Sequence, residues 1–221
     1  MWMNAALLES IPSFLIENIP EIKTSDIEQM LSAVNFDTGD LLRSSSHRFE
    51  GKRAIPMMTV SFHHHIFEKG MVPSPEEYLS EYEDQNKFFL ATIHEDDISG
   101  VRHRVMRAYP SLIRDVHFVC ECREMGYQAI RTVMDDISGV DAKIPMGDEE
   151  IKVRLYYDSP KSRTHKMMKA FSHVMGPNHY DLGLKKRDCL KIGDFMLYHP
   201  DAIGSFLASV RSEEGNLHEE S

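Results

Sequence analysis

No apolar stretch in the 221-residue sequence approaches the roughly 20 residues that a helix needs to cross a bilayer. Residues 1–20 carry acids and lack the basic region that opens a secretory signal peptide. The usual sequence signals for membrane insertion and for export are therefore missing. We expect a soluble, cytoplasmic protein with no membrane partner.

Cysteine is also scarce, and several enzyme motifs are absent. The three cysteines are Cys120, Cys122 and Cys189, an odd number without a second closely spaced pair. This count argues against a disulfide framework and against a four-cysteine zinc site. The sequence has no P-loop, no dinucleotide glycine fingerprint and no G-x-S-x-G motif, which disfavours NTPases, Rossmann oxidoreductases and esterases.

The net charge of −10 at first disfavours a nucleic-acid partner, because non-specific binding depends on Lys and Arg that neutralise phosphates. The charges are unevenly distributed, however. Residues 1–151 contain 14 Lys and Arg against 26 Asp and Glu, whereas residues 152–191 contain 10 against 3. Residues 152–191 therefore predict a surface that faces phosphates, and the alternative is a solvated basic helix face. The acidic N-terminal region is a candidate contact for a protein partner.

The chain is long enough for one core with an accessory region. We expect residues 1–100 to form a mainly helical accessory region. Residues 24–34 predict a short helix, and Ser74, Pro75 and Glu77 form the start signal of a second, with a capping serine, proline at the first helical position and glutamate two residues later. Residues 55–67, which lie between these helices, are β-prone or irregular.

The second half predicts an α/β core over residues 101–211. Strand Glu150–Tyr157 is the clearest element, because Ile151, Val153 and Leu155 alternate with polar residues. A polar, acidic tail at 212–221 predicts disorder. The elements expected in this half are a helix opened by Tyr109-Pro110 and closed by Gly126, strands at 127–133, 139–144 and 150–157, a basic helix at about 161–174, a strand at 194–198 and a helix at 200–211.

Asp141, Glu150 and Lys152 are the residues that best fit a catalytic site. Phosphodiester hydrolysis needs an activated water and neutralisation of charge on the transition state, which a carboxylate-held Mg²⁺ supplies. Asp141 and Glu150 offer the oxygen ligands that Mg²⁺ prefers. Lys152 lies on the same strand face as Glu150 and would orient or help deprotonate the water.

This site depends on the register of the hairpin between the two acids. Ile144-Pro145-Met146-Gly147 suits a tight turn that pairs residue 144 with residue 147. That register places Asp141 opposite Glu150, with Cβ atoms about 5 Å apart. A register slipped by one residue would put the acids on opposite faces. The alternative is that Asp141 lies in a turn and that Glu150 and Lys152 form an exposed, salt-bridged strand face.

The pattern resembles the motif of the PD-(D/E)xK nuclease superfamily, with Asp141 as the first acid and Glu150-Ile151-Lys152 as (D/E)xK. The resemblance covers roughly residues 105–200, with Val140 where the family has proline. It implies a restriction-endonuclease-like αβββαβ core and a DNA endonuclease that uses Mg²⁺, with Mn²⁺ as a substitute. The family often adds an acid from the first helix, and we choose Asp115 as this metal ligand.

A basic helix that follows the motif would guide DNA towards it. Ser159 is a plausible cap for this helix, and helical spacing brings its cations together. Phosphate contacts of this kind position DNA without reading its sequence. The residues assigned to nucleic-acid binding are Arg154, Lys161, Arg163, Lys166 and Lys169.

Two further functions stay open. One is a catalytically inactive nuclease-fold protein that acts as a nucleic-acid-binding or assembly module, and the other is a purely structural interaction protein. A homodimer would suit a double-strand cutter, but no sequence feature supports one. Consecutive His63, His64 and His65 would alternate between faces of a strand, and His117 does not share one helix face with both Cys120 and Cys122. We therefore interpret these residues as packing groups.

Overall fold

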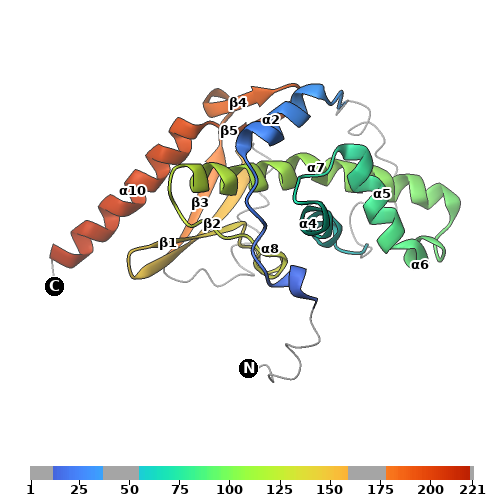
Figure 1. Ribbon diagram of the computed structural model, residues 1–221, viewed down its shortest axis with the longest axis horizontal. Helices are drawn as coiled ribbons and strands as arrows, with labels where there is room; N and C mark the ends of the chain where they lie inside the picture. Colours follow the sequence, from blue (N-terminus) through green and yellow to red (C-terminus); the bar gives the residue numbers. More distant parts are fainter. Residues whose placement is uncertain (1–11, 37–54, 159–177, 220–221) are drawn as a thin grey trace, which may run out of the picture.

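The computed structural model describes residues 12–36, 55–158 and 178–219, with side chains to residue 212. The described residues have a mixed α/β architecture of seven α-helices and two small sheets. Helix α7 (Glu95–Glu124) runs across the middle of the molecule (Figure 1). Helices α4 (Met58–Lys69), α5 (Pro75–Gln85) and α6 (Lys87–Leu90) gather around its first half, and the three-stranded sheet lies beside its second half (Figure 1).

The N-terminal part is helical, as the sequence predicts. Its elements are η1 (Ser13–Leu15), α2 (Thr24–Ala33), α4 (Met58–Lys69), α5 (Pro75–Gln85) and α6 (Lys87–Leu90). The predicted start of α5 is confirmed, because Ser74 and Glu77 form a reciprocal capping box and Pro75 opens the helix. The β-prone interpretation of residues 55–67 is wrong. This segment lies mostly in α4, where Phe62 and Ile66 are fully buried one turn apart.

The core helix, α7, starts earlier than the sequence predicts. The helix begins at Glu95, with His94 as its N-cap, and continues through Pro110. Proline removes one backbone donor from a helix but does not end it when the flanking turns are held by packing. Here Tyr109, Leu112 and Ile113 are all buried. The expected closing glycine, Gly126, does follow the helix and has a positive φ of 89°.

The first expected strand, at residues 127–133, is not formed. Only an isolated bridge joins Ile130 to Lys143, and the chain then enters α8 (Val133–Ile137). Thr132 caps α8 by accepting a hydrogen bond from the Asp135 backbone N–H at 3.1 Å. This side-chain cap favours a helix start where the β-prone composition alone predicts a strand.

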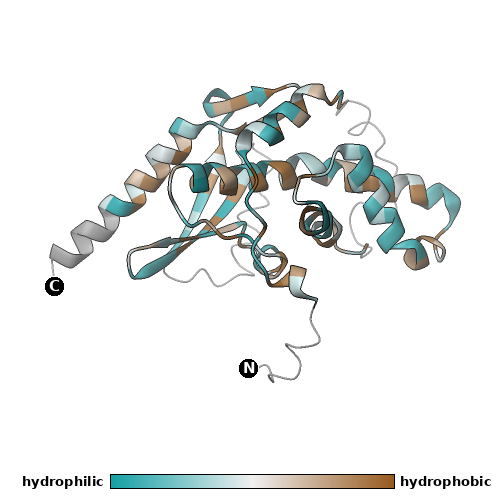
Figure 2. Cartoon of the chain, viewed as in Figure 1, coloured by the Kyte–Doolittle hydropathy of each residue, from teal (hydrophilic) through white to brown (hydrophobic). Residues whose placement is uncertain are grey.

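Strands β1 (Ala142–Met146), β2 (Glu149–Tyr157) and β3 (His179–Leu184) form a sheet in that order. β1 is antiparallel to β2, and β3 is parallel to β2. The expected strand at 150–157 is confirmed, with Ile151, Val153 and Leu155 buried. The tip of the β1–β2 hairpin is hydrophilic and exposed (Figure 2).

The C-terminal part adds a hairpin and a long helix. β4 (Cys189–Ile192) pairs with β5 (Phe195–Tyr198), and α10 (Pro200–Glu219) follows. The expected strand and helix are present, but α10 runs into residues 212–219, for which the sequence predicts disorder. Tyr198 joins this hairpin to the main sheet. Its hydroxyl donates to the Leu182 carbonyl at 2.8 Å and accepts from the Tyr156 N–H at 3.2 Å.

One hydrophobic cluster contains residues from both the expected accessory region and the expected core. Tyr109, on α7, lies at its centre. Its ring contacts the rings of Phe36, Phe62, Tyr78 and Phe195, and its hydroxyl donates to the Pro73 carbonyl at 2.6 Å. Within the described ranges, no helix combines the length and the apolar composition that membrane crossing requires.

Candidate functional site

The expected pairing of Asp141 with Glu150 is wrong. The register joins Ala142 to Val153 and Met146 to Glu149, which puts Asp141 beside Arg154. The two-residue turn is Gly147-Asp148 instead of Pro145-Met146, and Gly147 supplies the positive φ, 60°, that such a turn needs. Glu150 therefore lies nearer the hairpin tip, four residues before the β2 position opposite Asp141 and roughly 13 Å from it.

Glu150 and Lys152 occupy a different environment from Asp141. Glu150 is exposed near the hairpin tip and pairs with Pro145 across the strands. Lys152 is half-buried and pairs with Lys143, whose ammonium lies 2.5 Å from a carboxylate oxygen of Asp135. The three motif residues are thus not brought together.

Asp141 instead holds the end of the β1–β2 pair. Its Oδ2 accepts the Leu155 N–H at 2.6 Å, and its own N–H donates to the Val153 carbonyl at 2.9 Å. Its carbonyl oxygen accepts a hydrogen bond from Nη1 of Arg131 at 2.6 Å. Asp141 therefore satisfies backbone groups at the edge of the sheet and is linked to a buried cation.

Arg131 is fully buried and lies among three aspartates, and we call these four residues the Arg131 cluster. Its Nη2 is 3.2 Å from Asp136 Oδ1 and 3.7 Å from Asp115 Oδ2, and its Nη1 is 3.9 Å from Asp141 Oδ1. The fold thus brings Asp115, on α7, close to Asp141, which directly precedes β1. The sequence assigned both acids to a metal site. A guanidinium lies between them.

Burial dominates the electrostatics of this cluster. Burial raises the pKa of Asp115 well above its usual value, and the neighbouring Asp141 raises it further. Burial also raises the pKa of Asp141 to about 6, against the opposing effect of Arg131. Burial lowers the pKa of Arg131, but the surrounding carboxylates of Asp136, Asp115 and Asp141 outweigh that effect and raise it.

The expected Mg²⁺ site does not fit this arrangement. Mg²⁺ needs near-octahedral oxygen ligands at about 2.0–2.1 Å, and it is usually bound by one or two carboxylates with several waters. Glu150 is too distant to share an ion with Asp141, and the side chain that bridges Asp115 and Asp141 is the cationic Arg131. We therefore derive no hydrolytic step through a metal at Asp141, Glu150 and Asp115.

The sequence did contain a signal for the Arg131 cluster. Arg131 follows the apolar pair Ala129-Ile130, and a charge in such a segment needs acidic partners when it is buried. Asp135 and Asp136 follow within one helical turn, after the capping Thr132. The contribution of Asp115 is invisible in sequence, because it comes from α7 across the fold.

Of the five residues that the sequence assigns to nucleic-acid binding, the structure describes only Arg154. The side chain of Arg154 is only 19% exposed. Its Nε lies 3.8 Å from Asp181 Oδ1 on the neighbouring β3, so it faces a carboxylate. Lys161, Arg163, Lys166 and Lys169 lie outside the described residues. The described basic side chains that are exposed in this part of the chain are Lys185, Lys186, Arg187 and Lys191, on η2 (Lys186–Asp188) and its flanks.

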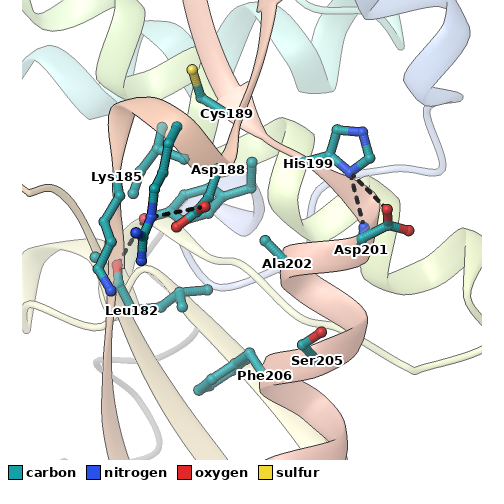
Figure 3. Close-up of a pocket in the computed structure, with 13 residues that line it drawn as sticks. Leu182, Lys185, Asp188, Cys189, His199, Asp201, Ala202, Ser205 and Phe206 are labelled. Carbon is teal, nitrogen blue, oxygen red and sulfur yellow. Dashed lines mark hydrogen bonds and ion pairs between the residues drawn. The ribbon is translucent and has the colours of Figure 1, made fainter.

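A cavity of about 700 Å³ adjoins this basic segment, which we define as residues 185–191. Figure 3 shows Lys185 and Asp188 on one side of the cavity and Ser205 and Phe206 of α10 on the other. Leu182 contributes an apolar wall from β3. A cavity of this size falls within the range of small-ligand sites, which run to about 1,000 Å³.

The acids at the cavity are paired with bases. Arg187 Nε lies 3.4 Å from Asp188 Oδ1, and His199 Nδ1 lies 3.5 Å from Asp201 Oδ2 (Figure 3). Lys185 also lines the cavity, and the arginine of the first pair is 78% exposed. The cavity lining therefore combines exposed cations and their acidic neighbours with apolar side chains.

Comparisons with known proteins give no relative from which to transfer a function. No family model, no curated protein and no solved structure matches the chain.

Proposed function

We propose that this protein is a DNA-binding module with a restriction-endonuclease-like core, and that its binding surface is the basic segment with the adjoining cavity. The observation that carries the proposal is the exposure of Lys185, Lys186 and Arg187 beside the cavity. Lys and Arg that neutralise phosphates supply most of the affinity of non-specific DNA binding.

The apolar part of the cavity adds a second kind of contact. Leu182 and Phe206 lie beside the cations, and single-stranded nucleic acid is bound by grooves that combine positive charge with aromatic contacts to bases. The Phe206 ring, with the two or three cations beside it, suits an unpaired nucleotide. We therefore expect single-stranded or branched DNA to bind more tightly than blunt duplex.

In this proposal the protein binds DNA, and Asp141, Glu150 and Lys152 do not catalyse its cleavage. Their separation and the buried Arg131 between the acids support this part of the proposal. The hydrogen bonds of Asp141 support a structural role for the residue that the motif assigns to metal binding. Endonuclease activity stays a prediction, and the cleavage assay below tests it.

The binding test uses fluorescence anisotropy with labelled single-stranded and duplex DNA across a NaCl series. We expect wild-type affinity to fall with salt. The triple variant Lys185→Ala, Lys186→Ala, Arg187→Ala should flatten the slope of log K against log salt by up to about 2–3, because each lost phosphate contact removes roughly 0.7–0.9. The matched control changes exposed lysines elsewhere, Lys23, Lys69 and Lys87, to alanine and removes the same charge.

If the control triple weakens binding as much as the basic-segment triple, net charge explains the effect and the proposed surface is wrong. The same DNA is then incubated with Mg²⁺, Mn²⁺ or EDTA. Metal-dependent cleavage that Glu150→Ala abolishes would overturn the non-catalytic part of the proposal. No cleavage by either protein, with intact salt-dependent binding, supports it.

A further inference from the structure

A mixed histidine and glutamate cluster lies where α2 packs against α7, and it contains His117, which the sequence alone indicates as a packing residue. His117 Nε2 is 3.2 Å from Glu28 Oε1 and 3.8 Å from Glu121 Oε1. The ligand atoms of the three residues all lie within 4.8 Å of one another. In the part of the chain that the structure describes, this is the one group of three or more such residues with metal-site spacing.

The two helices hold these side chains in place. His117 and Glu121 are one turn apart on α7, so they share a face. Glu124, further along α7, accepts hydrogen bonds from the Thr24 N–H at 2.7 Å and from its hydroxyl at 2.9 Å. These bonds fix the first turn of α2, and Glu28 follows one turn later on the same face. The cluster is therefore built on two docked helices.

The two distances from His117 Nε2 to the carboxylates suit a tetrahedral ion. Bonds of about 2.0–2.1 Å from Zn²⁺ to histidine nitrogen and carboxylate oxygen place neighbouring ligand atoms roughly 3.4 Å apart. The nitrogen-to-oxygen distances of 3.2 and 3.8 Å bracket that value. The distance of 3.2 Å is at the upper end of the range for a hydrogen bond, and the distance of 3.8 Å exceeds that range. Three protein ligands leave a fourth position open.

The charges of the cluster also favour a cation. Nε2 of His117 faces two carboxylates, but a neutral imidazole has one N–H to donate. Within the described residues, no Lys or Arg forms an ion pair with Glu28 or Glu121.

We infer that Glu28, His117 and Glu121 form a binding site for one Zn²⁺-class transition-metal ion, which would link α2 to α7. The side chain of His117 is fully buried, that of Glu121 is 9% exposed and that of Glu28 is 34% exposed. The site is thus enclosed on the α7 side and open to exchange beside Glu28. Imidazole nitrogen selects zinc, cobalt or nickel over the hard cations Mg²⁺ and Ca²⁺.

The test uses Co²⁺ and Zn²⁺ with protein that has been treated with a chelator. Co²⁺ should bind one equivalent per chain, with the visible absorption of a four-coordinate ion, and Zn²⁺ should displace it. Zn²⁺ titration by calorimetry should give one site, and bound Zn²⁺ should raise the Tm of the wild type. The key variant is Glu28→Gln, because its partly exposed side chain is replaced by an amide of the same shape.

Glu28→Gln should weaken Zn²⁺ binding at least tenfold and remove the Zn²⁺-dependent rise in Tm. The matched control is Glu81→Gln, which makes the same change at another histidine contact, His64 Nδ1 to Glu81 Oε1 at 2.8 Å. This control should bind Zn²⁺ as the wild type does. Zn²⁺ affinity of the wild type weaker than about 100 μM, or equal affinity in Glu28→Gln and wild type, would overturn the inference.

Discussion

The Arg131 cluster and the basic segment contain the same kinds of charged residue in opposite surroundings. Arg131 is fully buried and faces three aspartates, whereas the side chain of Arg187 is 78% exposed and lies 3.4 Å from Asp188. The buried guanidinium also donates to the Asp141 carbonyl and so links α7, α8 and the β1–β2 pair. The exposed guanidinium is available to solvent. Burial therefore separates a structural cation from a candidate binding cation.

The physical basis of this difference is desolvation. A buried ion loses several kcal/mol of hydration free energy. Oppositely charged partners offset this loss only when their geometry is good, and removal of one partner leaves a buried charge uncompensated. An exposed ion pair keeps its hydration and contributes about 0–1 kcal/mol. Removal of one charge should thus have a large effect on folding in the Arg131 cluster and a small one in the basic segment.

The largest expected effect is that of Arg131→Met. The variant leaves Asp115, Asp136 and Asp141 without their buried counter-ion and should lower the free energy of unfolding by about 3–5 kcal/mol. The measurement is urea unfolding at pH 7 followed by circular dichroism. Arg187→Met is the matched control and should change the stability by no more than about 0.5 kcal/mol.

Equal effects of the two substitutions would remove the distinction between buried and exposed charge. A double variant, Arg131→Met with Asp136→Asn, sharpens the test because the two residues are 3.2 Å apart. Coupling between the two substitutions should give a non-additive free energy of 0.5 kcal/mol or more, in the range of about 0.5–3 kcal/mol for contacting residues.

A middle-sized effect is expected at His63, which is buried near Arg131. Burial and the positive charge of Arg131 lower the pKa of His63 from 6.5 to about 4. Between these values the unfolded chain binds a proton that the folded protein does not. The histidine therefore causes stability to fall as the pH drops from about 6.5 to 4, by up to about 3 kcal/mol, and has no such effect above pH 6.5.

Asp115 and Asp141 act in the opposite direction. Their pKa values are raised by burial, to about 6 for Asp141, so the folded state binds their protons more tightly and stability rises as the pH falls from about 6 to 4. The difference between wild type and His63→Gln isolates the histidine. Unfolding curves at several pH values should show a smaller loss of stability on acidification for the variant, and parallel profiles would contradict the prediction.

The smallest effect is expected at the hairpin tip. Glu150→Gln changes an exposed side chain and should alter the free energy of unfolding by less than about 0.5 kcal/mol. Asp141→Asn weakens acceptance of the Leu155 N–H and contact with Arg131, and should cost about 1–3 kcal/mol. Thermal unfolding of the two variants under one set of conditions compares them. Similar losses in both would mean that Glu150 has a structural role that its exposure does not indicate.

Local sequence signals predicted the elements whose structure depends on neighbouring residues. The capping box at Ser74 and the alternation of Ile151, Val153 and Leu155 are examples, and both are confirmed. The same kind of signal failed at Pro110, because packing on both sides holds α7 together through the proline. It also failed at residues 55–67, where β-branched and histidine residues are buried on a helix face.

The candidate sites were less predictable, because they depend on register and on contacts between distant segments. A hairpin turn two residues further along the chain leaves Glu150 on the predicted face of β2 but removes it from Asp141. The contact of Asp115 with Arg131 joins α7 to a segment that precedes α8. The Glu28–His117 contact joins residues 89 positions apart.

The sequence by itself determined the mixed α/β composition, the main helices, strand β2 and the concentration of positive charge in residues 152–191. These features follow from side-chain periodicity, capping and composition, which act over a few neighbouring residues. The tertiary structure decided which charges are buried, because burial depends on how α7, α8 and the sheet pack together. It therefore decided that Asp141 meets Arg131 instead of Glu150, and that the exposed cations lie beside a cavity.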